Sequence, residues 1–140
     1  MPLIDLNQAR KILTNARTIA VIGLSPKETR PSHQVARYLL AAGYRVIPVN
    51  PGQERILDLP CYPSLELVPE PVDIVNIFRR SEEAPLLVEA AIRHPAKAVW
   101  LQEGVRHPEA ARRATAAGLA VFMDCCIKTI HEQLLIPPCP

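Results

Sequence analysis

A chain of 140 residues is long enough for one domain with a buried core, and 49% hydrophobic against 21% charged residues is the balance of a globular protein. Its 16 basic and 14 acidic residues leave a net charge of +2, which argues against a general nucleic-acid binder, and 4% aromatic residues leave few rings for stacking on bases. No apolar run approaches the roughly 20 residues of a membrane span, and residues 1–13 resemble an amphipathic helix more than a signal peptide. We therefore expect one cytoplasmic domain over 1–140 that binds neither nucleic acid nor membrane.

The hydrophobic periodicity predicts strands and helices that alternate along the chain. Asp5 is placed to cap the first helix, Pro31 suits the first turn of the second, and Ser81 is placed to cap the third. A later helix opens at His107-Pro108 and ends at Gly118. The expected elements are helices over 6–16, 31–42, 81–93, 108–118 and 126–135, and strands over 18–23, 44–49, 72–78, 97–101 and 119–123.

Residues 53–71 are polar and broken by prolines. We expect irregular structure there, with a short strand at Cys61-Tyr62 and a short helix capped by Ser64. In the first helix Leu6, Ile12 and Leu13 are expected to face the core.

Alternating strands and helices predict a parallel sheet with right-handed crossovers. The strands are continuous apolar runs, as expected when helices cover both faces. The expected fold is therefore α/β, a Rossmann-like doubly wound sheet of five parallel strands. Ligands of such folds bind beyond the carboxyl ends of the strands, which here are Gly23, Asn50, Phe78, Leu101 and Met123.

The turn out of the first strand has the layout of a nucleotide site. A run of β-branched residues stops at Gly23, and the chain reopens as a helix at Pro31-Ser32. The glycine lets the backbone approach a ligand, and the helix N-terminus presents free N–H groups to a phosphate. We expect the loop between them to hold the anionic part of a nucleotide.

Cationic side chains follow two neighbouring strands and are expected on one rim of the sheet. They are Lys27, Arg30, Arg79 and Arg80. Arginine forks match phosphate oxygens and a lysine adds a point charge, so the set suits a ligand with a diphosphate and a further phosphate. The alternative is that these are surface cations, some of them paired with Glu28, Glu82 or Glu83.

The same loops depart from the pattern of NAD-binding proteins. The first loop has one glycine instead of three, and the second strand ends in Val49-Asn50-Pro51 without the carboxylate that holds ribose hydroxyls. Asn50 either bonds a ribose or an adenine edge, or only initiates a turn. An NAD(P)-linked oxidoreductase stays as an alternative, with Arg79 or Arg80 on a 2′-phosphate.

Several residues near the strand ends have both a structural and a ligand-binding interpretation. Gly104 supplies a positive φ or room for a ligand, and His33 either touches a ligand or lies on the surface. Trp100 is expected to pack in the core. An Asp124–His131 dyad with a neighbouring cysteine as nucleophile is conceivable, although nothing in the spacing requires it.

The cysteines are not spaced as metal ligands. Cys61, Cys125, Cys126 and Cys139 form no CxxC motif, and we interpret them as reduced thiols that are mostly buried. We predict no metal site and no catalytic residue.

Four motifs follow one another at consistent spacing along the chain. They are Gly23-Leu24-Ser25 with Arg30-Pro31-Ser32, Gly43-Tyr44-x-Val46 into Pro48-Val49-Asn50-Pro51, Val72-Asp73-Ile74-Val75 into Phe78-Arg79, and Val99-Trp100-Leu101-Gln102-x-Gly104. With these motifs the chain resembles, over residues 10–135, the small stand-alone CoA-binding domain proteins. Those proteins are similar to the N-terminal CoA-binding domain of the succinyl-CoA synthetase α subunit and of NDP-forming acyl-CoA synthetases.

The resemblance implies that coenzyme A or an acyl-CoA lies along the strand ends. The first loop would hold the phosphates, Asn50-Pro51 and Phe78-Arg79 would flank the nucleotide, and the 102–104 segment would lie by the pantetheine. Cys125 or Cys126 would lie near the thiol. The candidate ligand-binding residues are Gly23, Leu24, Ser25, Lys27, Arg30, Pro31, Ser32, Asn50, Pro51, Phe78, Arg79, Arg80, Gln102, Glu103 and Gly104.

In the synthetases a second domain carries a phosphorylated histidine and an ATP-grasp module supplies the nucleotide chemistry, and a chain of this length has room for neither. The resemblance therefore implies a non-catalytic CoA carrier, sensor or regulatory protein, as a monomer or homodimer that a protein partner could recruit. A partner-binding module with an empty nucleotide pocket is the remaining alternative.

Overall fold

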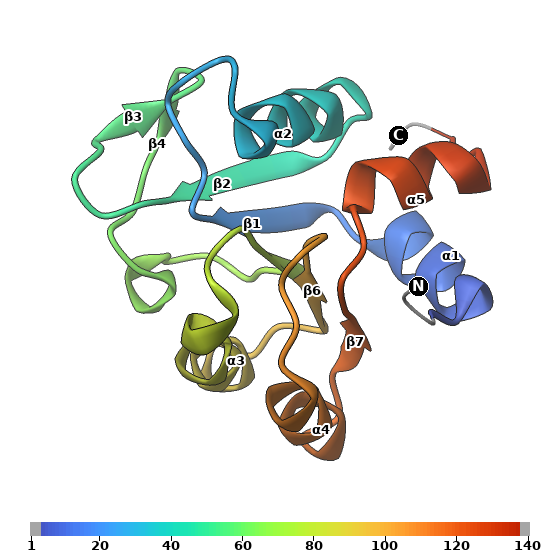
Figure 1. Ribbon diagram of the computed structural model, residues 1–140. Coiled ribbons are helices and arrows are strands. Elements are labelled where there is room, and N and C mark those ends of the chain that lie inside the picture. Colours follow the sequence, from blue (N-terminus) through green and yellow to red (C-terminus); the bar gives the residue numbers. More distant parts are fainter. Residues whose placement is uncertain (1–3, 138–140) are drawn as a thin grey trace.

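The computed structural model describes residues 4–137 and shows a parallel β-sheet between two layers of helices (Figure 1). The strand order is β2-β1-β5-β6-β7, and all neighbouring strands are parallel. The predicted Rossmann-like five-stranded fold is confirmed, with each strand slightly shorter than expected. The strands are β1 (Thr18–Ile22), β2 (Arg45–Val49), β5 (Ile74–Ile77), β6 (Ala98–Leu101) and β7 (Ala120–Phe122).

Helices cover both faces of the sheet, as the apolar strands predicted. Successive strand residues point to opposite faces, so Val21 faces one helical layer and Ala20 the other, and both are fully buried. The layer on the Val21 side contains α1 (Leu6–Asn15), α2 (Pro31–Ala41) and α5 (Ile127–Leu134), and the opposite layer contains α3 (Ala84–Arg93) and α4 (Pro108–Ala116) (Figure 1).

The parallel register brings the carboxyl ends of the central strands to one level. Ile22 at the end of β1 lies beside Val49 of β2 and Ile77 of β5, and Ile77 lies beside Leu101 of β6. The loops that follow these four strands therefore emerge side by side, at the edge where ligands of such sheets bind.

Trp100 packs in the core, as predicted. Its fully buried ring stacks on Phe122 with ring centroids 4.3 Å apart, and its Nε1 donates to the carbonyl of Cys125 at 3.0 Å. This bond satisfies the only polar group of the indole and ties the end of β6 to the segment that leads into α5.

The first helix begins as predicted but is covered differently. Asp5 Oδ1 accepts from the N–H groups of Asn7 and Gln8 at 3.0 and 3.1 Å. Ala9 and Leu13 form the buried stripe, whereas Leu6, which was expected in the core, is 40% exposed. The cause is that α1 packs largely against α5, which covers a narrow stripe and leaves the first turn open.

Two expected helix caps are wrong. Ser81 lies in a short 3-10 turn, Ser81–Glu83, ahead of α3, and its hydroxyl accepts from the Arg106 N–H at 2.9 Å instead of capping the helix. Ser64 precedes a 3-10 turn over Leu65–Leu67 and makes no side-chain cap bond.

The segment expected to be irregular contains a small hairpin. β3 (Arg55–Ile56) pairs antiparallel with β4 (Leu59–Pro60), and Leu57 and Asp58 between them have φ values of 56° and 59°. Two successive positive φ values suit the twist of a hairpin, but Asn or Gly usually supplies them, so the sequence carried no hairpin signal. The short strand expected at 61–62 is present as a bridge between Tyr62 and Val49.

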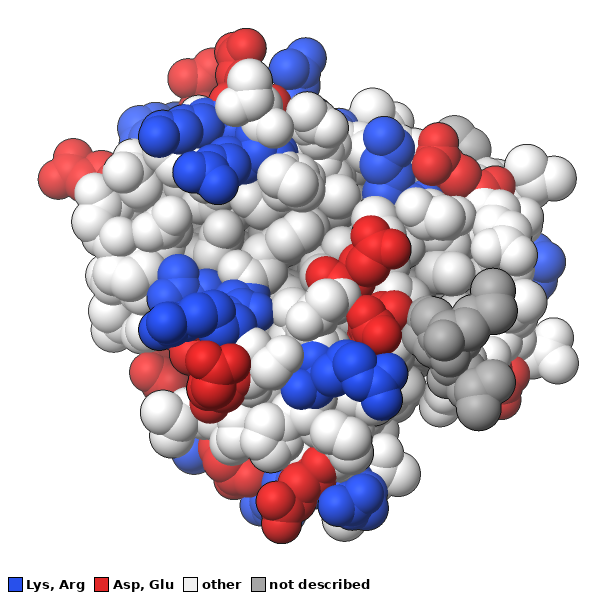
Figure 2. Space-filling model, viewed as in Figure 1, with Lys and Arg blue, Asp and Glu red and all other residues white. Residues whose placement is uncertain are grey.

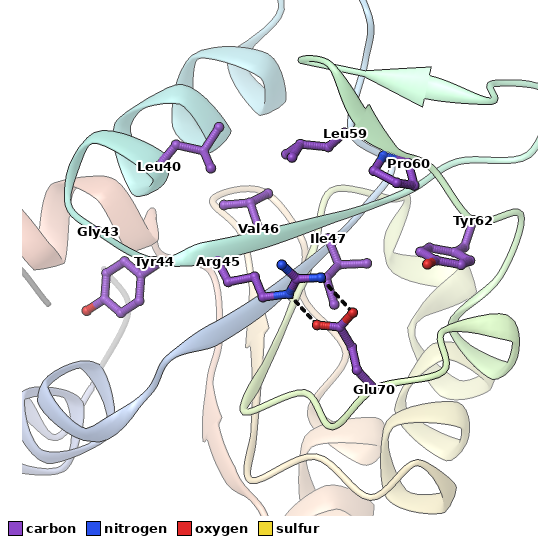
Figure 3. A pocket seen from close by; sticks show the side chains of 10 residues that line it. All are labelled: Leu40, Gly43, Tyr44, Arg45, Val46, Ile47, Leu59, Pro60, Tyr62 and Glu70. Carbon is purple, nitrogen blue, oxygen red and sulfur yellow. Dashed lines mark hydrogen bonds and ion pairs between the residues drawn. The ribbon is translucent and has the colours of Figure 1, made fainter. Parts of the chain in front are cut away.

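The outer edge of β2 is protected by an ion pair, a proline and the chain around Tyr62. A hollow of about 310 Å³ lies along the start of this strand, and Arg45 and Glu70 form an ion pair at its border (Figure 3). Pro48 has no N–H to offer at the edge, and its carbonyl accepts from the Tyr62 N–H at 3.1 Å. These features protect the edge against pairing with another strand, and the hollow does not reach the strand-end loops.

Among residues 4–137, no helix is both long enough and apolar enough to cross a bilayer.

Candidate functional site

Three adjoining hollows lie at the carboxyl ends of the strands. We call them the apolar hollow, of about 380 Å³, the loop hollow, of about 330 Å³, and the β6 hollow, of about 440 Å³. Gly23 borders the apolar and loop hollows, Phe78 the loop and β6 hollows, and Arg79 the apolar and β6 hollows. Because they share these residues, one extended ligand can occupy all three.

Most of the predicted site residues line these hollows. The exceptions are Leu24, Asn50 and Gly104. The prediction missed part of the apolar hollow, because α3 and the segment after β4 contribute to it. The missed apolar residues include Ile22, Val49, Leu65, Leu86 and Leu87.

Leu86 marks the lip of the apolar hollow. It is 78% exposed, although it is a large apolar side chain on α3, and it lines the hollow together with the half-buried Leu87. An exposed leucine at the lip of a concave apolar surface is typical of a ligand-binding site, where the ligand covers the leucine. The sequence signal for this surface was the pair of adjacent leucines on α3. Two successive helix residues point in different directions, so both cannot face the core of an amphipathic helix.

The loop hollow combines two cations with a helix N-terminus. Lys27 and Arg30 are exposed, and within the described residues neither has an acidic partner at ion-pair distance. α2 begins at Pro31, and the side chain of Arg30 at its N-cap position makes no cap bond. Pro31 has no N–H, and the His33 and Gln34 N–H groups both donate to the Arg30 carbonyl at 3.1 Å, so the Ser32 N–H is the one that the start of α2 can offer to an anion in this hollow.

Hydrogen bonds hold the loop against α2. The Ser25 N–H donates to Ser32 Oγ at 3.0 Å, and Ser25 Oγ accepts from the Lys27 N–H at 3.1 Å. His33 is buried, so the interpretation of a surface residue was wrong, and its Nδ1 lies 3.0 Å from the Ser25 carbonyl. Because a carbonyl only accepts, Nδ1 carries the proton and donates a hydrogen bond to the Ser25 carbonyl. His33 thereby holds the loop against α2.

Gly23 is required for contact with the neighbouring strand, a reason that the sequence did not indicate. Its φ is +86°, and a Cβ there would lie 2.2 Å from the Phe78 carbonyl oxygen and 2.9 Å from Arg79 Cδ. Only a glycine allows the end of β1 to pass so close to the end of β5, whether or not a ligand is bound. The stem of Arg79 therefore lies over Gly23.

Asn50 positions the first loop. Its Nδ2 donates to the Leu24 carbonyl at 2.8 Å, and its N–H donates to the Tyr62 carbonyl at 2.9 Å. The Leu24 side chain is fully buried in the core, so this residue offers a ligand only its backbone. The Leu24 carbonyl already accepts the hydrogen bond from Asn50 Nδ2.

The four predicted cations form two groups of different character. Arg79 donates to Glu83 Oε1 from Nε at 3.1 Å and from Nη2 at 3.0 Å, and Arg80 Nε lies 3.5 Å from Glu83 Oε2. The hydrogen bonds from Arg79 lower the pKa of Glu83, so this carboxyl is ionised. Pairing with Glu83 is thus found for Arg79 and Arg80, while Lys27 and Arg30 remain unpaired in the described chain.

Figure 2 shows basic side chains in separate groups on this face, over the β1–α2 loop and over the segment between β5 and α3. A hollowed, uncharged surface lies between these groups. The basic surface at this rim is therefore discontinuous, with an uncharged surface between its parts.

Hydrogen bonds from α5 and from the segment after β7 hold the loop that lines the β6 hollow. Gln102 is buried, and its Oε1 accepts from the Ile127 N–H at 3.0 Å, which caps α5. Gly104 has a φ of +87°, which confirms the predicted positive φ, and no atom of the described protein lies within 4 Å of the position that a Cβ would take there. Its N–H donates to Asp124 Oδ1 at 2.7 Å.

Asp124 is a site-organising residue that the sequence did not single out for this role. It has a φ of 60°, and its Oδ2 accepts from Arg106 Nη1 at 3.3 Å. The conceived dyad with His131 is absent from the described chain, because His131 Nδ1 bonds the Tyr38 hydroxyl at 2.7 Å. Burial lowers the pKa of His131 and keeps its ring neutral.

The cysteines near the site differ in reactivity. Cys125 is buried, and this burial raises the pKa of its thiol to about 12, so it is not a thiolate nucleophile. Cys126 is half-buried at the start of α5, Cys61 is half-buried beside the Asn50 carbonyl, and Cys139 lies outside the described residues. Among residues 4–137, no cluster of His, Cys, Asp and Glu could hold a metal ion.

This strand-end site belongs to a stretch with known relatives: residues 17–132 match the family described as the CoA binding domain. The chain belongs to the CoA-binding domain family. The resemblance inferred from the four motifs is thereby confirmed.

Relatives of this CoA-binding domain protein include stand-alone chains. It is 40% identical over 124 residues to the uncharacterized protein YneT of Bacillus subtilis, covering 89% of this chain and 92% of that protein. It superposes with a TM-score of 0.92 on the structure of a hypothetical protein from Pyrococcus horikoshii, at 38% identity and 96% coverage of both chains.

Other relatives contain the domain as one part of a larger enzyme. The chain is 30% identical over 118 residues to the ADP-forming acetate–CoA ligase II of Archaeoglobus fulgidus. The match covers 76% of this chain but only 18% of the ligase. The chain is therefore homologous to the CoA-binding region of that enzyme.

Proposed function

We propose that this protein binds coenzyme A or an acyl-CoA along the carboxyl edge of its sheet and does not itself catalyse a reaction. The observation that carries the proposal is that three hollows adjoin one another through Gly23, Phe78 and Arg79, with the unpaired Lys27 and Arg30 beside the N-terminus of α2. An apolar surface, a basic loop at a helix start and a surface of mixed polarity that adjoin one another match a ligand made of a base, phosphates and a pantetheine arm.

The apolar hollow suits the adenine ring. Ile22, Val49 and Leu65 are buried side chains that form its floor, and Leu86 at its lip is mostly exposed without a ligand. A flat base placed there removes apolar surface from water on both of its faces, which favours binding.

The loop hollow suits the phosphates. Lys27 and Arg30 supply two positive charges, and the hydroxyl and N–H of Ser32 supply donors. Phosphates bind well at helix N-termini because the N–H groups there have no partner within the helix.

The β6 hollow suits the pantetheine arm. Phe78 and Val105 give it apolar contact, and Gln102 and Glu103 give it polar contact. We propose no catalytic role for this site, because the buried, protonated Cys125 is a poor nucleophile. A carrier or regulatory role fits a domain that presents a thioester at an open rim.

The test is a calorimetric titration of the purified protein with CoA, with NADPH as the comparison ligand. We expect CoA to bind in the micromolar range and Arg30→Ala to weaken binding about tenfold, the equivalent of one charge-assisted hydrogen bond. Arg112→Ala is the matched control, since it removes an exposed arginine from α4 on the opposite layer. Absence of CoA binding, tighter binding of NADPH, or equal effects of the two substitutions would contradict the proposal.

A further inference from the structure

Glu83 holds both arginines of the β5–α3 segment. Its Oε1 accepts two bonds from Arg79, and its Oε2 accepts from the Arg80 N–H at 3.3 Å and from Arg80 Nε at 3.5 Å. Glu83 and Arg79 both border the apolar hollow and the β6 hollow. We call this ion pair the septum, because it stands between the two hollows.

The septum is fixed at both of its ends. Glu83 is the last residue of the 3-10 turn and is followed directly by α3, and its bond to the Arg80 N–H forms half of a capping box. The stem of Arg79 lies over Gly23, where no side chain separates it from the backbone. A ligand therefore meets Arg79 with its charge already matched by a carboxylate.

We infer that Glu83 is a specificity-determining residue of this site: its carboxylate neutralises Arg79 and thereby confines the phosphates of the ligand to the loop hollow, beside Lys27 and Arg30. The inference rests on the proposed function. It assigns Arg79, which the sequence placed among the phosphate ligands, to the wall beside the base and the pantetheine.

The septum and the loop hollow differ in how much of their positive charge is neutralised. Arg79 and Arg80 together with Glu83 sum to one positive charge, whereas Lys27 and Arg30 present two with no acid paired to them in residues 4–137. An anion at the septum must either displace a carboxylate held by several hydrogen bonds or accept its repulsion. The loop hollow carries neither penalty.

The test replaces Glu83 by glutamine. A glutamine of nearly the same size removes the negative charge and keeps one acceptor oxygen, so it can preserve either the bond from Arg79 to Oε1 or the bond from the Arg80 N–H to Oε2. Glu82→Gln is the matched control, because Glu82 is an exposed acid in the same turn that forms no ion pair within the described chain. Equal thermal midpoints for the three proteins show that the fold is unchanged.

We expect Glu83→Gln to lower the dissociation constant for CoA about fivefold at roughly 20 mM salt, and Glu82→Gln to change it less than about twofold. The gain should vanish near 0.5 M salt, where the Debye length falls to about 4 Å. Adding Arg79→Ala should abolish the gain in the Glu83→Gln protein but change binding little in the protein with Glu83, because only the unpaired guanidinium attracts the phosphates.

The outcomes separate this inference from the proposed function. If CoA binds the unmodified protein but Glu83→Gln binds it equally or more weakly, Glu83 does not exclude anions and the inference is overturned, while CoA binding stands. If no form of the protein binds CoA, the proposed function fails and the inference fails with it.

Discussion

Substituting Gly23 by alanine tests why a glycine follows the first strand. The sequence suggested that this glycine lets the backbone approach a ligand, whereas in the structure the added Cβ meets the Phe78 carbonyl oxygen at 2.2 Å. If the structural reason is right, Gly23→Ala destabilises the protein even when no ligand is present. Gly118→Ala is the control, since Gly118 has a similar φ of +92° but open space around its Cβ position.

Two contributions determine how much Gly23→Ala lowers the free energy of unfolding. A left-handed conformation costs an alanine about 1–2 kcal/mol, and both variants share this cost. Overpacking against a backbone carbonyl adds roughly 1–3 kcal/mol to Gly23→Ala, because the end of β5 must move. With about 4 °C per kcal/mol for a domain of this size, Gly23→Ala should melt roughly 4–12 °C below Gly118→Ala.

Urea and thermal unfolding of both variants without ligand measure this difference. Equal destabilisation of the two proteins would show that the contact with β5 is not what demands a glycine. A Gly23→Ala protein that is as stable as Gly118→Ala but fails to bind CoA would restore the ligand-approach explanation.

The remaining predictions concern buried groups. Burial lowers the pKa of His131 below its ordinary value of 6.5, so the unfolded chain binds more protons between the two values and the free energy of unfolding should fall as pH decreases from about 7 to 5. Urea unfolding across this range should show a smaller slope for His131→Phe, and an unchanged slope would refute the assignment. Burial also raises the pKa of Cys125 to about 12, so alkylation of the native protein at pH 8 should modify Cys126 well before Cys125, as read by peptide mass spectrometry. Comparable labelling of both thiols would contradict this order.

Much of the fold was predictable because its signals are local. Apolar runs ended by Gly23 or by Asn50-Pro51 mark strands, and Asp5 places a cap two and three residues ahead of the N–H groups that it binds. The hairpin after β2 was not predictable, since Leu57-Asp58 carries no turn signal of its own. Its geometry is imposed by strand pairing, which can override local preference.

The candidate site was predictable in outline for the same reason. In a parallel sheet every strand ends at one edge, so the residues after β1, β5 and β6 could be grouped from the sequence alone. The partners within that group could not be assigned. Ser81 was expected to cap its own helix, yet it bonds Arg106, and Asp124 holds Gly104 across twenty positions of the chain.

By itself, the sequence determined the alternation of strands and helices, the edge that carries the site and the family to which the chain belongs. Only the tertiary structure decided which cations are free, what Gly23 avoids and that leucines of α3 wall one of the hollows. The physical reason is the separation along the chain of the residues that interact. Strand and helix propensities depend on neighbours a few residues away, whereas charge pairing and close packing depend on the register that brings Gly23, Arg79 and Glu83 together.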